Sequence, residues 1–136
     1  MGLRAEYKLF ISHYFKENDE YKRLIELLDD NISIQYSCSS IPVSYKYRSL
    51  SKMQLEDQLR MQIKTAHCFL ALDGVYLASP EWVEYELKVA GKLGIPIIGI
   101  KQMKIKEVSS IISGYAKAVV GWNIDSIVTA IKDCSI

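Results

Sequence analysis

A glutamate in the middle of an apolar helix face is the residue of this sequence best placed to do chemistry. Residues 79–93 are predicted to form a helix, and at about 100° per residue its apolar side chains gather in one stripe made of Trp82, Val83, Val89, Ala90 and Leu93. Glu86 falls inside that stripe. A buried carboxylate is costly unless it is paired or lines a cleft, where it can act as a catalytic acid, base or cation stabiliser. The pattern leaves a catalytic site and a buried salt bridge equally open.

Three further groups of side chains could contribute to such a site. Trp82 lies one helical turn before Glu86 and could pack against a base or a nicotinamide ring, or be an ordinary core tryptophan. Ser12 and His13 follow the first predicted strand; they point to opposite faces and cannot form a nucleophile–base pair, but both could line a cleft. The simpler interpretation of Ser12 is that it satisfies loop backbone groups. The run 45–48, Tyr-Lys-Tyr-Arg, could stack an adenine and bind phosphates, or simply be an exposed loop.

Composition limits the possible function classes. The chain has 136 residues, which suits a single domain spanning 1–136, and its net charge of +1 does not favour nucleic acid or an anionic membrane as a partner. Cys38, Cys68 and Cys134 are odd in number and widely spaced, which indicates reduced cysteines of a cytoplasmic protein. We expect no metal site, because no spacing suits zinc, and neither a signal peptide nor a membrane span.

Apolar, strand-like runs alternate with amphipathic helical stretches along the chain. The five predicted strands are 7–11, 32–38, 67–72, 95–100 and 118–122. The five predicted helices start near Asn18, Ser51, Ser79, Glu107 and Asn123, and the segments 39–50 and 73–78 are interpreted as loops. This alternation predicts an α/β protein with a five-stranded parallel sheet and helices on both faces, a three-layer fold. Ligands of such sheets bind beyond the carboxyl ends of the strands, where residues 12–14, 39–50 and 73–78 are expected.

Other recognised site patterns are missing or incomplete. No Gly-x-Gly-x-x-Gly, P-loop or Gly-x-Ser-x-Gly motif occurs in the sequence. Asp73 ends the third predicted strand, where a receiver domain carries its phosphoacceptor. A receiver also needs an acidic pair after the first strand, and here that place is taken by Ser12, His13 and Tyr14. We therefore expect Asp73 to have a helix-turn role.

Several short segments, in order along the chain, resemble the TIR superfamily. Residues 10–13, Phe-Ile-Ser-His, are similar to the first TIR box, and residues 79–86 carry the Trp-x-x-x-Glu signature of TIR domains that cleave NAD. Further segments at 51–52, 62–63, 74–76, 96–101 and 120–123 are similar to the TIR-like family that includes the Thoeris antiphage signalling proteins. The resemblance covers residues 7–132.

The resemblance implies a flavodoxin-like fold and an NAD glycohydrolase or ADP-ribosyl cyclase activity, with NAD as substrate and no cofactor. By matching positions Glu86 is the catalytic glutamate, and the segment 39–50 matches the BB loop. The implied substrate-binding residues are Phe10, Ser12, His13, Tyr14, Tyr45, Tyr47, Tyr76 and Trp82. The implied partners are a downstream effector that senses an ADP-ribose-derived, cyclic signalling nucleotide, and further copies of the chain through TIR–TIR contacts.

Two other functions stay open. TIR-like modules can signal by self-assembly without catalysis, and fold alone does not separate the two roles. A nucleoside deoxyribosyltransferase-like enzyme also uses a glutamate on N-glycosidic bonds, and it would release free bases and ignore NAD. The segments Phe10–Ser12 and Val120–Asn123 favour the TIR-like interpretation over this last one. The sequence does not choose between cyclic, linear and conjugated ADP-ribose products.

Overall fold

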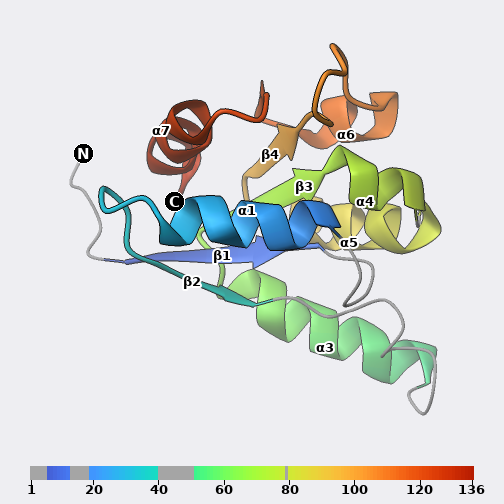
Figure 1. Ribbon diagram of the computed structural model, residues 1–136. Coiled ribbons are helices and arrows are strands. Elements are labelled where there is room, and N and C mark those ends of the chain that lie inside the picture. Colours follow the sequence, from blue (N-terminus) through green and yellow to red (C-terminus); the bar gives the residue numbers. More distant parts are fainter. Residues whose placement is uncertain (1–5, 13–18, 40–50, 79) are drawn as a thin grey trace.

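A five-stranded parallel sheet organises the chain (Figure 1). The computed structural model describes residues 6–12, 19–39, 51–78 and 80–136. The strands are β1 (Tyr7–Ile11), β2 (Tyr36–Ser39), β3 (Cys68–Leu72), β4 (Ile97–Ile100) and β5 (Ala118–Val120). The helices are α1 (Asp19–Asp29), α3 (Lys52–Lys64), α4 (Asp73–Ala78), α5 (Pro80–Leu93), α6 (Ser110–Tyr115) and α7 (Ile124–Cys134).

The strand order is β2-β1-β3-β4-β5, and every neighbouring pair is parallel. Right-handed crossovers then place α1 and α7 on one face and α3, α5 and α6 on the other. The contacts agree, because α1 packs against α7 while α5 packs against both α3 and α6. The predicted three-layer fold with a parallel sheet and helices on both faces is confirmed.

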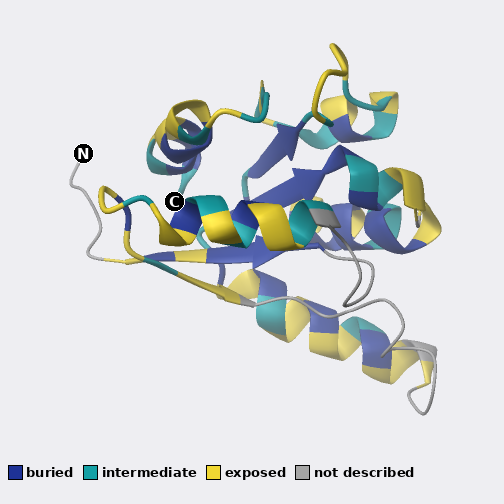
Figure 2. Ribbon diagram, viewed as in Figure 1, coloured by how far each residue is buried: buried dark blue, intermediate teal, exposed yellow. Residues whose placement is uncertain are grey.

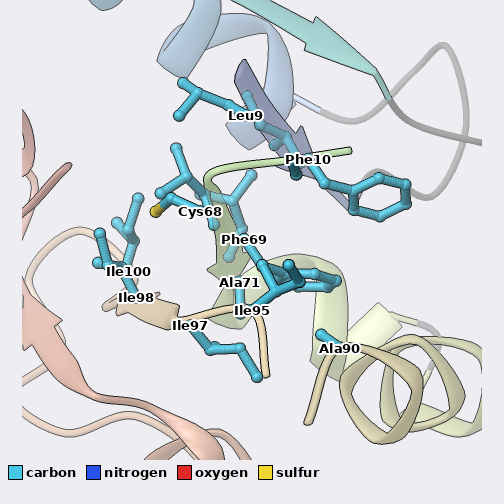
Figure 3. Packing of buried hydrophobic residues seen from close by; sticks show 14 of the residues in the cluster. Leu9, Phe10, Cys68, Phe69, Ala71, Ala90, Ile95, Ile97, Ile98 and Ile100 are labelled. Carbon is cyan, nitrogen blue, oxygen red and sulfur yellow. The ribbon is translucent and has the colours of Figure 1, made fainter. Parts of the chain in front are cut away.

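The core lies on both faces of the three central strands (Figures 2 and 3). All five residues of β3 are buried, as the continuous apolar run predicted. In Figure 3, Leu9 and Phe10 extend to opposite sides of β1, so this strand also contributes to both layers. The edge strand β5 is only partly covered, and Val119 is exposed there.

Local sequence signals fix several helix ends. Ser51 and Gln54 form the predicted capping box at the start of α3, with the Gln54 backbone N–H donating to the Ser51 hydroxyl at 3.1 Å. Asn123 caps α7 by accepting a hydrogen bond from the Ser126 backbone N–H. Gly94 follows α5 with φ of 73°, a backbone conformation that glycine adopts without steric cost. The expected caps Asn18 and Ser79 lie outside the described residues.

Four predicted elements need correction. The second strand does not begin at Ile32, which is 98% exposed; a turn precedes β2, which starts at Tyr36. The segment 73–78, interpreted as a loop, is the helix α4, so the described residues contain six helices and not five. The predicted helix from Glu107 to Lys117 is reduced to α6, and the last strand ends at Val120 instead of Trp122.

None of the helices in the described parts of the chain is long and apolar enough to cross a membrane.

Gly99 and Gly114 form a matched pair that tests the packing of β4 against α6. A Cβ at Gly99 would lie 2.7 Å from Cγ2 of buried Ile112, whereas a Cβ at Gly114 meets nothing within 4 Å. We expect Gly99→Ala to lower the free energy of unfolding by about 1–3 kcal/mol through overpacking. Gly114→Ala, inside α6, should raise it by about 0.5–1 kcal/mol. Urea unfolding followed by circular dichroism measures both, and equal values for the two variants would contradict this packing.

Candidate functional site

Helix α5 carries Glu86 on its buried face. The helix begins at Pro80, which suits the first helical position because it has no N–H to satisfy. Its buried side includes Trp82, Val83, Leu87, Val89 and Ala90. Glu86 lies among them with no exposed surface, while Glu81 is exposed and Glu84 is partly exposed. The predicted position of Glu86 within an apolar stripe is confirmed.

Strand β1 brings Ser12 to this carboxylate. Ser12 is the first residue after β1, a strand paired with β2 on one side and β3 on the other. Its hydroxyl donates a hydrogen bond to Oε1 of Glu86, 74 residues further along the chain, and Ser12 has no exposed surface either. Glu86 is therefore held by a neutral hydroxyl donor at the carboxyl end of the sheet, where ligands of parallel sheets bind.

Two buried aromatic residues, Trp82 and Phe10, lie close to this pair along the chain. Trp82 is 2% exposed and lies one turn before Glu86, with its ring 6.1 Å from that of Tyr85. Phe10 is fully buried, and its ring stacks on Phe69 with centroids 5.2 Å apart. Phe10 therefore packs within the core, whereas Trp82 shares the face of α5 that carries Glu86.

The other expected site residues are only partly described. Tyr76 lies on α4, partly buried against the core. His13, Tyr14, Tyr45 and Tyr47 lie outside the described residues. The structure thus brings together Ser12, Trp82 and Glu86 from two elements.

The carboxylates of Asp73 and Glu20 link elements at the same edge of the sheet. The sequence pattern does not identify them as a pair. Asp73, the first residue of α4, is buried and accepts hydrogen bonds from the backbone N–H and the hydroxyl of Ser109, at 2.9 and 2.7 Å. Glu20 in α1 accepts a hydrogen bond from the Gly74 backbone N–H at 2.9 Å. A Cβ at Gly74 would collide with the carboxyl end of the Glu20 side chain, so any larger residue would displace this carboxyl from the Gly74 backbone. Asp73 was expected to have a helix-turn role; it does begin α4, but its side chain binds Ser109 and not the turn of its own helix.

Burial changes the proton affinity of Glu20. Desolvation raises the pKa of this carboxyl above its usual value of 4.5, the Gly74 hydrogen bond opposes the shift, and the nearby Asp73 adds to it.

The Glu20–Gly74 and Asp73–Ser109 contacts have no local sequence signal, because the partners are 54 and 36 residues apart. Within the described ranges, no group of three or more His, Cys, Asp and Glu side chains could hold a metal ion.

Comparison with known proteins identifies the family. The family model for the TIR-like domain of Thoeris protein ThsB matches residues 10–107, which include Ser12, Trp82 and Glu86. The chain belongs to this ThsB TIR-like family. Thoeris is an antiphage defence system, so the chain is a TIR-like protein of antiphage defence. The resemblance stated from the sequence is confirmed.

Among solved structures, one shows that the fold of this ThsB-like chain is shared with another protein. A 2-deoxyribosyltransferase from the psychrotolerant bacterium Bacillus psychrosaccharolyticus is similar, with a TM-score of 0.60, 14% identity, and coverage of 88% of this chain and 89% of that one. A 3-dehydroquinate dehydratase-like protein from Bifidobacterium longum aligns with a TM-score of 0.49 and 8% identity over 96% and 95% of the two chains. No curated protein matches the sequence. At these identities the likeness concerns the fold alone.

The raised pKa of Glu20 predicts a pH-dependent stability difference. A carboxyl whose folded-state pKa lies above the unfolded value binds its proton more tightly when folded, so its ionisation costs stability as pH rises through that window. Glu20→Gln keeps an acceptor for Gly74 and removes the charge. We expect its free energy of unfolding to exceed that of the wild type at pH 7, and the difference to shrink as pH falls through the raised pKa and to vanish below about 4.5. Urea unfolding across this pH range measures it.

Glu26→Gln is the matched control, because Glu26 is exposed on the same helix. This control should follow the wild-type curve at every pH. A Glu20→Gln variant that is less stable than the wild type at pH 7, or whose difference does not depend on pH, would contradict the assigned environment of Glu20.

Proposed function

We propose that this protein cleaves NAD at the bond between nicotinamide and ribose, with Glu86 as the catalytic residue. The observation that carries the proposal is the fully buried Glu86 carboxylate, held by Ser12 on the Trp82 face of α5. A carboxylate kept from water next to an aromatic ring suits the stabilisation of a developing cation. Membership of the Thoeris TIR-like family supports the same activity.

The reaction needs little more than this carboxylate. As the glycosidic bond breaks, neutral nicotinamide leaves with the electron pair and an oxocarbenium-like cation forms on the ribose. Glu86 stabilises that cation and holds the ribose hydroxyls. Nicotinamide is already a good leaving group, so no second acid is required. If an atom of the same ADP-ribose captures the cation, a cyclic signalling nucleotide forms; water gives linear ADP-ribose, and a second molecule gives a conjugate.

The surrounding side chains provide the binding site in this proposal. Trp82 packs against the nicotinamide end of NAD, and Tyr76 on α4 contacts the substrate from the neighbouring element. Family resemblance adds His13, Tyr14, Tyr45 and Tyr47 as further expected substrate-binding residues, which lie outside the described residues. Ser12, Trp82 and Glu86 are almost wholly excluded from solvent, so the site has to open before NAD reaches the carboxylate. A downstream effector senses the product, and contacts between copies of the chain favour the open site.

Glu86→Gln tests the proposal directly. The wild-type protein, at high concentration with NAD, is expected to release nicotinamide and an ADP-ribosyl product. Because glutamine carries no charge to stabilise the cation, we expect the variant to be slower by at least about 100-fold. Mass spectrometry of the mixture measures both products, and the mass of the ADP-ribosyl product separates cyclisation, hydrolysis and conjugation.

Glu81→Gln is the matched control, because Glu81 is an exposed carboxylate on the same helix, and its activity should equal that of the wild type. The assay is repeated with extract of phage-infected cells, which supplies an activating cue. Intact NAD under all of these conditions would refute cleavage and favour a module that signals by self-assembly. Release of free bases from deoxynucleosides with NAD left intact would instead favour deoxyribosyl transfer.

A further inference from the structure

The Glu86 carboxylate is held by a side chain from a different structural layer. Ser12 and Glu86 come from the end of β1 and the middle of α5, and neither has exposed surface. The backbone before Ser12 is fixed from both sides, since Phe10 pairs with Ser39 of β2 and Ile11 with Leu70 of β3. The hydroxyl that meets Glu86 therefore belongs to the residue directly after a strand that is paired on both sides.

We propose that Ser12 is a positioning residue that keeps Glu86 ionised and fixes its orientation, acting through the carboxylate and not through contact with the substrate. The proposal rests on the proposed function of Glu86 and deepens it. It assigns to Ser12 a role different from the substrate contact that family resemblance implies.

The first step concerns charge. Removing a carboxylate from water favours its protonated form, which could not stabilise a cation as an anion does. A hydrogen bond donated to the charged form shifts the balance back towards ionisation. An ionised carboxylate accepts hydrogen bonds only, and the Ser12 hydroxyl is the donor that meets Oε1. Ser12 thus offsets part of the cost of burying the charge of Glu86.

The second step concerns orientation. A glutamate side chain has three rotatable torsions, whereas serine has one, so the serine is the better anchor of the two. The apolar neighbours of Glu86 on α5, such as Val83 and Leu87, offer no hydrogen bonds from their side chains. The hydrogen bond from Ser12 fixes where Oε1 of Glu86 lies relative to the end of β1. A cation stabiliser loses effect when its charge is misplaced.

Steady-state kinetics of Ser12→Ala test this role. Loss of the donor should lower kcat for NAD cleavage about 10-fold or more with KM nearly unchanged, because the substrate contacts remain. The acid limb of the pH–rate profile should move to higher pH by about one unit, as expected for a lost hydrogen bond to a charged group. Ser12→Thr keeps the hydroxyl and should restore the profile. Ser12→Cys, which is similar in size to serine and a weak donor, should give an intermediate shift and replaces the threonine variant if that one does not fold.

A second measurement separates this proposal from the proposed function. Glutamate side-chain carboxyls are labelled with ¹³C, the Glu86 resonance is assigned from its absence in Glu86→Gln, and its titration is followed without substrate. In Ser12→Ala it should titrate at higher pH than in the wild type. If NAD stays intact but this shift occurs, NAD cleavage fails while Ser12 still controls the Glu86 charge.

Three results would overturn the role of Ser12. One is NAD cleavage by folded Ser12→Ala with unchanged kcat, pH profile and Glu86 titration. Another is a rise in KM alone, which would make Ser12 a substrate contact. The third is a ribosyl adduct on Ser12 detected by mass spectrometry, which would make it a nucleophile. Thermal unfolding of each variant confirms that the compared proteins are folded.

Discussion

The burial of one carboxylate is the constraint on which the site depends. Glu86 has no exposed surface, and a charge in such a place is tolerated only where hydrogen bonds replace water. Ser12 at the end of β1 provides one such hydrogen bond. This contact requires the carboxyl end of β1 to lie against the buried face of α5. The strand order β2-β1-β3-β4-β5, with β1 beside β3 and α5 in the crossover from β3 to β4, provides that arrangement.

The carboxyl edge of the sheet is joined by polar contacts as well as by the core. Glu20 binds the backbone of Gly74 and thereby joins α1 to α4, and Asp73 binds Ser109 and joins α4 to the segment before α6. Helix α4 also packs against α5, which carries Trp82 and Glu86. Helix α4 thus links both helical layers next to the candidate site, although no local sequence pattern predicts it. Its close approach to Glu20 depends on the absence of a side chain at Gly74.

The fold by itself does not determine the reaction. A 2-deoxyribosyltransferase shares the architecture at 14% identity, and TIR-like domains can also act by assembly. Family membership and the burial of Glu86 support the proposed NAD cleavage, because a buried carboxylate one helical turn from an aromatic residue suits a reaction whose leaving group needs no protonation. The near-complete burial of Ser12, Trp82 and Glu86 makes access to the site a separate step from the chemistry.

The sequence by itself determined the parallel α/β fold, which follows from the alternation of strand-like and helical stretches. It also determined the burial of Glu86, which follows from the hydrophobic periodicity of one helix. It also fixed the ends of α3, α5 and α7, where capping and glycine signals act over a few residues. It misplaced Ile32 and overlooked α4, because short apolar runs are compatible with turn, helix or strand until packing selects one. Only the tertiary structure decided that Ser12 meets Glu86 and that Glu20 meets Gly74. The first contact joins residues separated by 74 positions in the chain, and the second joins residues separated by 54 positions. Such contacts depend on how whole elements pack, and no local pattern encodes them.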